Sequence, residues 1–133
     1  MKDRGFTLLE MLVVLAVLGL VAGLVVGRGP SRSAGLDVRM AANQLAATLR
    51  AARSEAIAAD HPVIVVIDGA AGTVRIGGAA PRALGAVLSP QARPLVFAPD
   101  GSSAGATIGV AAGPVRKRVT VDWLTGRVSI ADG

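Results

Sequence analysis

The feature that most constrains this chain is its start, where a short charged segment runs into a long apolar one. Residues 1–5 carry three charged side chains, and residues 6–27 are apolar apart from Thr7 and the carboxylate of Glu10. A helix over residues 6–27 would be about 33 Å long, enough to cross a hydrocarbon core of about 30 Å. Because a carboxylate is costly inside such a helix, Glu10 is expected to serve a function.

The charges around this apolar run predict its orientation. Lys2 and Arg4 precede the run, and basic residues favour the cytoplasmic side, so the rest of the chain is expected across the membrane. The alternative is a cleaved secretory signal peptide. The run is longer than the usual apolar region of about 7–15 residues, no clear A-x-A site follows it, and Glu10 interrupts it. The pattern therefore favours a retained transmembrane helix over residues 6–27.

The six residues GFTLLE, at positions 5–10, resemble the processing site of type IV prepilins and type II secretion pseudopilins. The resemblance implies that a prepilin peptidase cuts after Gly5, so that residues 1–5 are a leader, and that Phe6 becomes the N-methylated first residue. It also implies that Glu10 pairs with the amino terminus of a neighbouring subunit. Two opposite charges that are each costly in lipid relieve one another when subunits meet, which favours assembly.

Three glycines at a spacing of four residues form a second pattern in the apolar run: Gly19, Gly23 and Gly27. Small residues at this spacing line one helix face and allow a partner helix to approach closely. Glycine is also common in membrane helices without this role, and the motif alone leaves both interpretations open. Glu10 and Gly19 are nine residues apart, which predicts that they lie on roughly opposite faces.

The middle of the chain predicts a joint followed by an amphipathic helix. Residues 28–35 are rich in Gly, Pro and Ser and predict a kink or a short non-helical joint near Gly29 and Pro30. Helical periodicity then covers residues 36–60. Its apolar stripe, expected to pack on the chain's own sheet, consists of Val38, Leu45, Leu49, Ala52 and Ala56.

Residues 61–133 have the alternation and turn signals of a β domain. Residues 77–94 predict a loop with one short strand near residues 84–88. Residues 95–110 predict a strand, a turn and a strand. Residues 118–123 alternate so that Val119, Val121 and Trp123 are expected to point inward, with Val128 and Ile130 continuing that face.

Three segments of this region and of the helix before it resemble the GspH/FimT group of minor pseudopilins and pilins: residues 49–57, 97–108 and 121–130. Together with the N-terminal motif, they imply a pilin-like α+β fold, with an N-terminal transmembrane and amphipathic helix followed by an antiparallel β-sheet domain.

The composition offers little for catalysis or for metal binding. The chain has no cysteine, no tyrosine and a single histidine, His61, which is expected to be a polar residue at a helix end. The loop around Asp100 has one carboxylate, whereas calcium sites gather several oxygen ligands. The sequence therefore predicts no enzyme, no metal site and no cofactor.

Nucleic-acid binding is the sharper alternative. The net charge of +5 falls to +4 once Lys2, Asp3 and Arg4 are removed with the leader. Some FimT-like pilins carry a C-terminal GRxR-type motif, but here residues 126–129 are GRVS, so serine replaces the second arginine. The residues that would contact phosphates are Arg116, Lys117, Arg118 and Arg127. A solvated basic hairpin that protects a sheet edge explains the same charges and is the favoured interpretation.

These observations predict a minor pseudopilin of the type II secretion system, taking part in protein secretion. Its expected partners are other pseudopilins of the filament, the prepilin peptidase and N-methyltransferase, the bacterial inner membrane and a secreted cargo, with DNA disfavoured. The N-terminus is expected in the cytoplasm and the C-terminal domain in the periplasm. The alternative is a FimT-like minor pilin of a type IV pilus that binds DNA for uptake.

Overall fold

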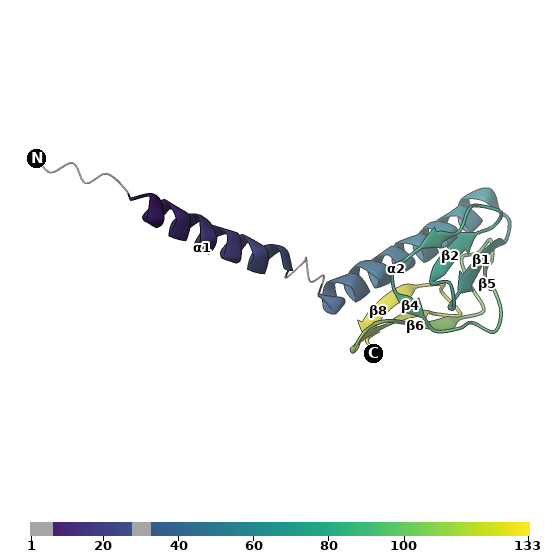
Figure 1. The fold of residues 1–133 in the computed structure, drawn as a ribbon. Coiled ribbons are helices and arrows are strands. Elements are labelled where there is room, and N and C mark those ends of the chain that lie inside the picture. Colours follow the sequence, from purple (N-terminus) through teal and green to yellow (C-terminus); the bar gives the residue numbers. More distant parts are fainter. Residues whose placement is uncertain (1–6, 28–32) are drawn as a thin grey trace, which may run out of the picture. The chain divides into compact units, whose positions relative to one another are not determined.

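The computed structural model describes residues 7–27 and 33–133 (Figure 1). The chain divides into two units, Met1–Arg32 and Ser33–Gly133, and each is described by itself. The predicted cleavage and methylation residues, Gly5 and Phe6, and the predicted kink at Gly29 and Pro30 lie outside the described residues.

The first unit contains one helix, α1, which covers Leu8–Gly27. Thr7 precedes the helix, and its hydroxyl oxygen and its carbonyl oxygen both accept from the backbone N–H of Glu10, at 3.3 and 3.0 Å. This is the capping position at which threonine satisfies an N–H that has no partner inside the helix. Among the described residues, no helix has the length and apolar character needed to cross a membrane.

The second unit begins with a longer helix, α2, which covers Ala34–Ala59. It starts two residues before the predicted bound because the Ser33 hydroxyl caps it, accepting from the backbone N–H of Leu36 at 3.2 Å. It ends where Asp60 adopts a left-handed conformation with φ 51°, and Pro62 follows two residues later. The predicted apolar stripe is confirmed, since all five of its residues are buried.

The strands of this unit form two antiparallel four-stranded sheets. In the first sheet the order is β3-β2-β1-β5, and in the second it is β4-β6-β7-β8. The strands of the first sheet are β1 Val63–Asp68, β2 Thr73–Ile76, β3 Arg82–Ala83 and β5 Leu95–Phe97. Those of the second are β4 Val87–Leu88, β6 Ala106–Ala112, β7 Val115–Val121 and β8 Val128–Asp132.

The division into two sheets adds to what the sequence patterns predicted. Residues 77–94 hold two short strands, β3 and β4, in place of the single strand expected, and each belongs to a different sheet. Strands β5 and β6 follow one another in the chain but do not pair with each other, since β5 pairs with β1 and β6 with β7. The turn after β5 closes through a bond from the N–H of Ala98 to the carbonyl of Ser102, and Ser103 then bonds to Trp123 beside the second sheet.

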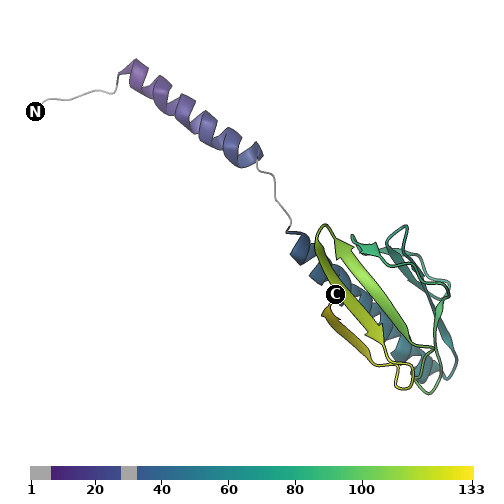
Figure 2. The same cartoon turned by 90° about the horizontal axis from the view of Figure 1, so that it is seen from below.

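Helix α2 packs against strands of both sheets, and the core of the unit lies between them. In Figure 2, α2 lies behind the strands of the second sheet. The largest fully buried side chains include Phe97 from β5, Leu45 and Leu49 from α2, and Ile108 from β6. Five alanines of α2 are also buried, and their small size lets the strands approach the helix: Ala41, Ala42, Ala46, Ala52 and Ala56.

The predicted alternation of inward and outward side chains is confirmed within the C-terminal strands but not beyond the end of β7. Val119, Val121 and Val128 are buried and Ile130 is half-buried, as expected. Trp123 was expected to point inward, but this prediction is wrong, because the residue is 65% exposed. Strand β7 ends at Val121, and the next residues form a turn, so the two-residue period no longer determines which way Trp123 points.

Candidate functional site

The candidate assembly residues of α1 lie on two faces of one uninterrupted helix. Glu10 is exposed in the first turn, and Gly19 and Gly23 lie further along, with Gly27 as the last residue. Nine residues at about 100° each place Gly19 about half a turn away from Glu10. A Cβ atom added at Gly19 or Gly23 would meet nothing within 4 Å, so the glycine face of α1 is open.

Between Leu8 and Leu24, helix α1 also exposes apolar side chains all around it. The exposed fraction is 86% for Leu8, 68% for Leu15 and 67% for Leu20. A helix that is apolar on every side is stable only in an apolar environment, such as a lipid bilayer or a bundle of helices. The surface of α1, taken by itself, is therefore suited to an apolar environment.

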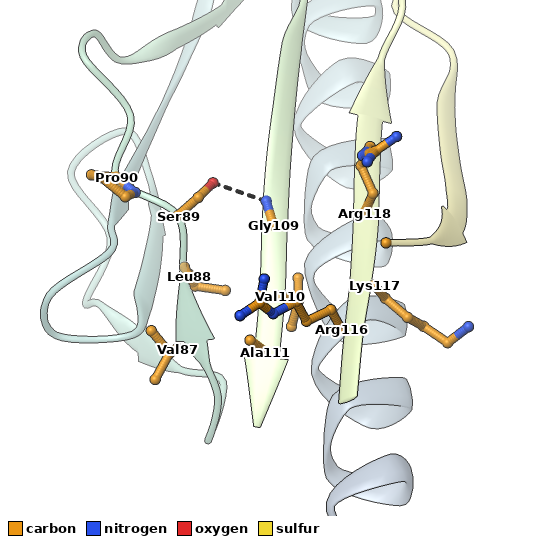
Figure 3. Close-up of a pocket in the computed structure, with 11 residues that line it drawn as sticks. Val87, Leu88, Ser89, Pro90, Gly109, Val110, Ala111, Arg116, Lys117 and Arg118 are labelled. Atoms are coloured by element: carbon orange, nitrogen blue, oxygen red, sulfur yellow. Dashed lines mark hydrogen bonds between the residues drawn. The ribbon is translucent and has the colours of Figure 1, made fainter. Parts of the chain in front are cut away.

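The four basic residues singled out by the sequence do not form one surface. Arg116 and Arg118 point to the same side of β7 (Figure 3), and Lys117 points to the other, where its Nζ lies 2.6 Å from Oδ1 of Asp132. The hydrogen bond from Lys117 and its charge lower the pKa of Asp132 below the ordinary value. Arg127 lies beyond Val121, at least about 10 Å along the strand from Arg118.

The turn that joins β7 to β8 is organised by a single carboxylate. One oxygen of Asp122 accepts from the backbone N–H of Thr125 at 2.8 Å, from its hydroxyl at 2.8 Å and from the N–H of Leu124 at 3.1 Å. The two bonds from Thr125 are the main reason that the pKa of Asp122 is below its ordinary value. The turn holds Trp123 and Leu124 in solvent, and the two residues are 65% and 62% exposed.

Two arginines of α2 have structural roles that the sequence did not indicate. Arg53 donates from Nε to the carbonyl of Gly101 at 3.0 Å, and Arg50 donates from Nη2 to the carbonyl of Val128 at 3.0 Å. Gly126 packs closely here, since a Cβ atom at this position would fall on the carbonyl oxygen of Gly101. The carbonyl partners are 48 and 78 residues away in the chain, so no local pattern could have revealed them.

The described residues offer no cluster suited to metal binding. No group of three or more His, Asp or Glu side chains lies close enough to hold a metal ion within residues 7–27 and 33–133. His61 lies exposed after the end of α2, where its Nδ1 is 3.2 Å from the carbonyl oxygen of Pro62. One oxygen of Asp100 accepts from the N–H and the hydroxyl of Ser102, at 2.9 and 2.6 Å, and these bonds lower its pKa.

Comparison with known proteins places the chain in a family. Residues 1–26 match the prokaryotic N-terminal methylation motif, and residues 41–126 match the type II transport protein GspH family. The chain belongs to the GspH family. The type II secretion system protein H of Xanthomonas campestris pv. campestris is 34% identical over 94% of this chain and 81% of the relative.

Two solved structures share the fold of the chain. The minor pseudopilin EpsH from the type 2 secretion system of Vibrio cholerae matches with a TM-score of 0.59 and 17% identity, over 72% of this chain and 97% of EpsH. The type IV minor pilin FimU of Pseudomonas aeruginosa matches with a TM-score of 0.57 and 20% identity, over 70% of this chain and 91% of FimU.

These findings confirm the predicted family, the pilin-like α+β fold and the assignment as a minor pseudopilin of the type II secretion system. Members of the family are structural subunits, and membership implies association with other pseudopilins. The methylation motif and the family together imply a membrane-anchored subunit of a periplasmic pseudopilus.

Proposed function

We propose that this protein is a minor pseudopilin that a prepilin peptidase cleaves after Gly5 and methylates at Phe6. Residues 6–27 would then span the inner membrane once, with the N-terminus in the cytoplasm and Ser33–Gly133 in the periplasm. The observation that carries this proposal is the contrast between α1, whose apolar side chains are exposed all around, and a second unit that buries its own core. Such a helix needs an apolar environment outside the chain.

Glu10 makes the assembled state lower in free energy than dispersed monomers. Cleavage after Gly5 creates a positively charged amine at Phe6, and Glu10 lies four residues further along. Each unpaired charge has a free-energy cost in lipid. A pair formed between neighbouring subunits lowers the cost of both charges and sets the register of the two helices. The Thr7 cap begins α1 immediately before this carboxylate, so Glu10 is held in the first helical turn.

The opposite face of α1 suits close helix packing. Gly19 and Gly23 carry no side chain, and their surroundings in the chain are open, so a neighbouring helix could approach their backbone closely. A helix with a charged contact on one face and a small-residue contact on the other can pack with subunits on both sides. This supports incorporation in a filament. The position at or near the filament tip, where the β domain would meet other minor subunits or a secreted cargo, is a separate part of the proposal.

The intact mass of the membrane-extracted protein tests this proposal. We expect the loss of residues 1–5 and the gain of one methyl group in cells that hold the prepilin peptidase, and the full-length mass in cells that lack it. The variant Gly5→Ala should remain uncleaved in both strains. A cut near residues 22–35 that does not depend on the peptidase would contradict the proposal, because it would identify an ordinary exported domain.

The second candidate is a FimT-like minor pilin of a type IV pilus that binds DNA. It rests on the likeness of the fold to FimU and on the two arginines that β7 presents to solvent. The two functions share the same processing and differ in nucleic-acid affinity. Tight, salt-sensitive binding of duplex DNA by the full-length protein would favour the pilus, and its absence would favour the secretion pseudopilus.

A further inference from the structure

A groove runs along the second sheet on the face that looks away from α2 (Figure 3). Its volume is about 440 Å³, and it is lined by β4 with the two residues after it, by β6 and by β7. The alternation along β7 explains the position of the groove: Val119 and Val121 are buried on the inner side, which leaves Arg116 and Arg118 on the outer side. The groove therefore belongs to the surface of the domain and not to its core.

Small residues make the floor of the groove, and a fixed segment makes one wall. Gly109 and Ala111 supply the floor from β6. Ser89 is held against β6 by two bonds, because its N–H donates to the carbonyl of Gly109 and its hydroxyl oxygen accepts from the N–H of Gly109, both at 2.8 Å. Val87 and Pro90 beside it are exposed and make this wall apolar.

The opposite wall carries two positive charges that have no acidic partner in the described part of the chain. The one ion pair formed there joins Lys117 to Asp132, on the other side of β7. By register, Arg116 lies opposite Ala111 and Arg118 opposite Gly109, so both side chains leave β7 directly beside the floor. Residues two apart on one strand are separated by about 7 Å.

We propose that this groove binds an extended segment of another protein, one that carries two acidic side chains two residues apart together with apolar ones. An extended segment repeats its side-chain direction every two residues, so carboxylates at positions i and i+2 match the spacing of Arg116 and Arg118. A carboxylate can accept two parallel N–H bonds from a guanidinium group. Its apolar neighbours would contact Val87 and Pro90.

The charge pattern excludes a second copy of this chain as the occupant. The chain is net positive, and no two of its nine acidic residues stand two positions apart. Single-stranded nucleic acid fits less well than an acidic peptide, because single strands usually stack on aromatic side chains and none lines the groove. Duplex DNA is left to the experiment below. Trp123, the exposed aromatic residue of the domain, belongs to the turn at the far end of β7.

Three fluorescently labelled probes test the inference on the full-length protein in detergent. The first is an eight-residue peptide of alternating valine and aspartate. The second has the same composition, with its aspartates placed next to one another, and the third is duplex DNA. We expect fluorescence anisotropy to show that the alternating peptide binds more tightly than the other two, and that its binding weakens as salt is added.

Paired variants identify the groove as the binding site. Arg116→Gln with Arg118→Gln should weaken binding of the alternating peptide about ten-fold, as expected for the loss of two partly exposed ion pairs. The control, Arg82→Gln with Arg93→Gln, removes the same charge from exposed positions outside the groove and should change affinity less than about two-fold. Ala111→Leu fills the floor without a change of charge and should also weaken binding.

Each other outcome would overturn the inference. Equal losses in the two double variants would mean that only net charge matters, and equal binding of the two peptides would remove the spacing argument. Tighter binding of DNA would make the groove a nucleic-acid site. If the alternating peptide does not bind at about 1 mM, the groove is not a binding site for an acidic segment of this kind. The mass of each variant after processing is measured separately, so failure of this inference is distinguishable from failure of the proposed function.

Discussion

The two units of this protein differ in whether they bury their apolar side chains. Helix α1 has leucines and valines on every side and leaves them exposed, whereas α2 has one apolar stripe and covers it with two sheets. The second unit buries its core without help from another molecule. The exposed apolar surface of the first unit is suited to a bilayer or a helix bundle, the environment that we propose for it.

This contrast explains how one short chain can be both an anchor and a recognition module. The stability of the domain arises from long-range contacts inside Ser33–Gly133, so its outer surface is available for binding. The proposed stability of α1 arises from contacts with lipid and with neighbouring subunits. Changes in the two units should therefore have separable effects, and four predictions test this separation, in decreasing order of the expected change.

The largest effect is expected at Glu10. Glu10→Ala should leave processing and the folding of the domain unchanged but reduce incorporation in filaments at least about ten-fold, because the amine of the neighbouring subunit loses its partner. Filaments sheared from cells and quantified by immunoblotting measure incorporation. Glu55→Ala, which removes an exposed carboxylate from α2, should assemble as the wild type does. Normal incorporation of Glu10→Ala would show that charge pairing does not drive assembly.

The next largest effect is expected in the core of the domain. Phe97 is fully buried, so Phe97→Ala should lower the free energy of unfolding of the domain by about 3–5 kcal/mol. Denaturant titration in detergent, followed by the fluorescence of Trp123, measures this change. Val96→Ala alters the adjacent outward side chain of β5 and should cost less than about 1 kcal/mol. Similar costs for the two variants would contradict the assigned core.

A smaller effect is expected where α2 holds the loops at one end of the sheets. Arg53→Met keeps much of the side-chain volume and removes the bond from Nε to the carbonyl of Gly101, so we expect a cost of about 1–2 kcal/mol. The same denaturant titration measures it. Arg82→Met, at an exposed arginine of β3, is the matched control and should be close to neutral. A neutral Arg53→Met would mean that the bond to Gly101 adds nothing to stability.

The smallest effect is expected in the pH dependence of the turn at Asp122. The bonds from Thr125 hold the pKa of Asp122 below its ordinary value of about 3.9, so the folded state favours the ionised form. Its contribution to stability is present above about pH 3.9 and is lost as the pH falls through the lower pKa of the folded state. Asp122→Asn should therefore reduce the slope of stability against pH below about pH 4. An unchanged slope would contradict this assignment.

Several features were predictable because local patterns decide them. The apolar run of α1, the stripe of α2 with Val38, Leu45 and Leu49, and the alternation of Val119 and Val121 each follow from periodicity. The N-terminal motif at residues 5–10 indicated the family, and comparison with known proteins confirmed it. The roles of Gly5, Phe6 and the glycine face remain predictions.

Other features depended on which distant segments meet. Whether a strand such as β4 joins one sheet or the other is decided by its pairing with β6, more than 20 residues later, and β4 itself is only two residues long. Trp123 is exposed because a turn held by Asp122 interrupts the alternation that predicted burial. The groove beside Arg116 and Arg118 exists because β6 brings Gly109 and Ala111 between β7 and β4.

Local patterns in the sequence were enough to predict an apolar N-terminal helix with one carboxylate, an amphipathic helix and a β-rich domain, and the resemblance of its motifs implied the pilin-like fold. The division of the strands between two sheets became visible only in the folded chain, and so did the arginines that bond to distant carbonyls and those that remain in solvent. The difference arises because helical and strand periodicity depends only on residues a few positions apart in the chain. The pairing of strands and the surfaces they form depend instead on contacts between residues far apart in the chain.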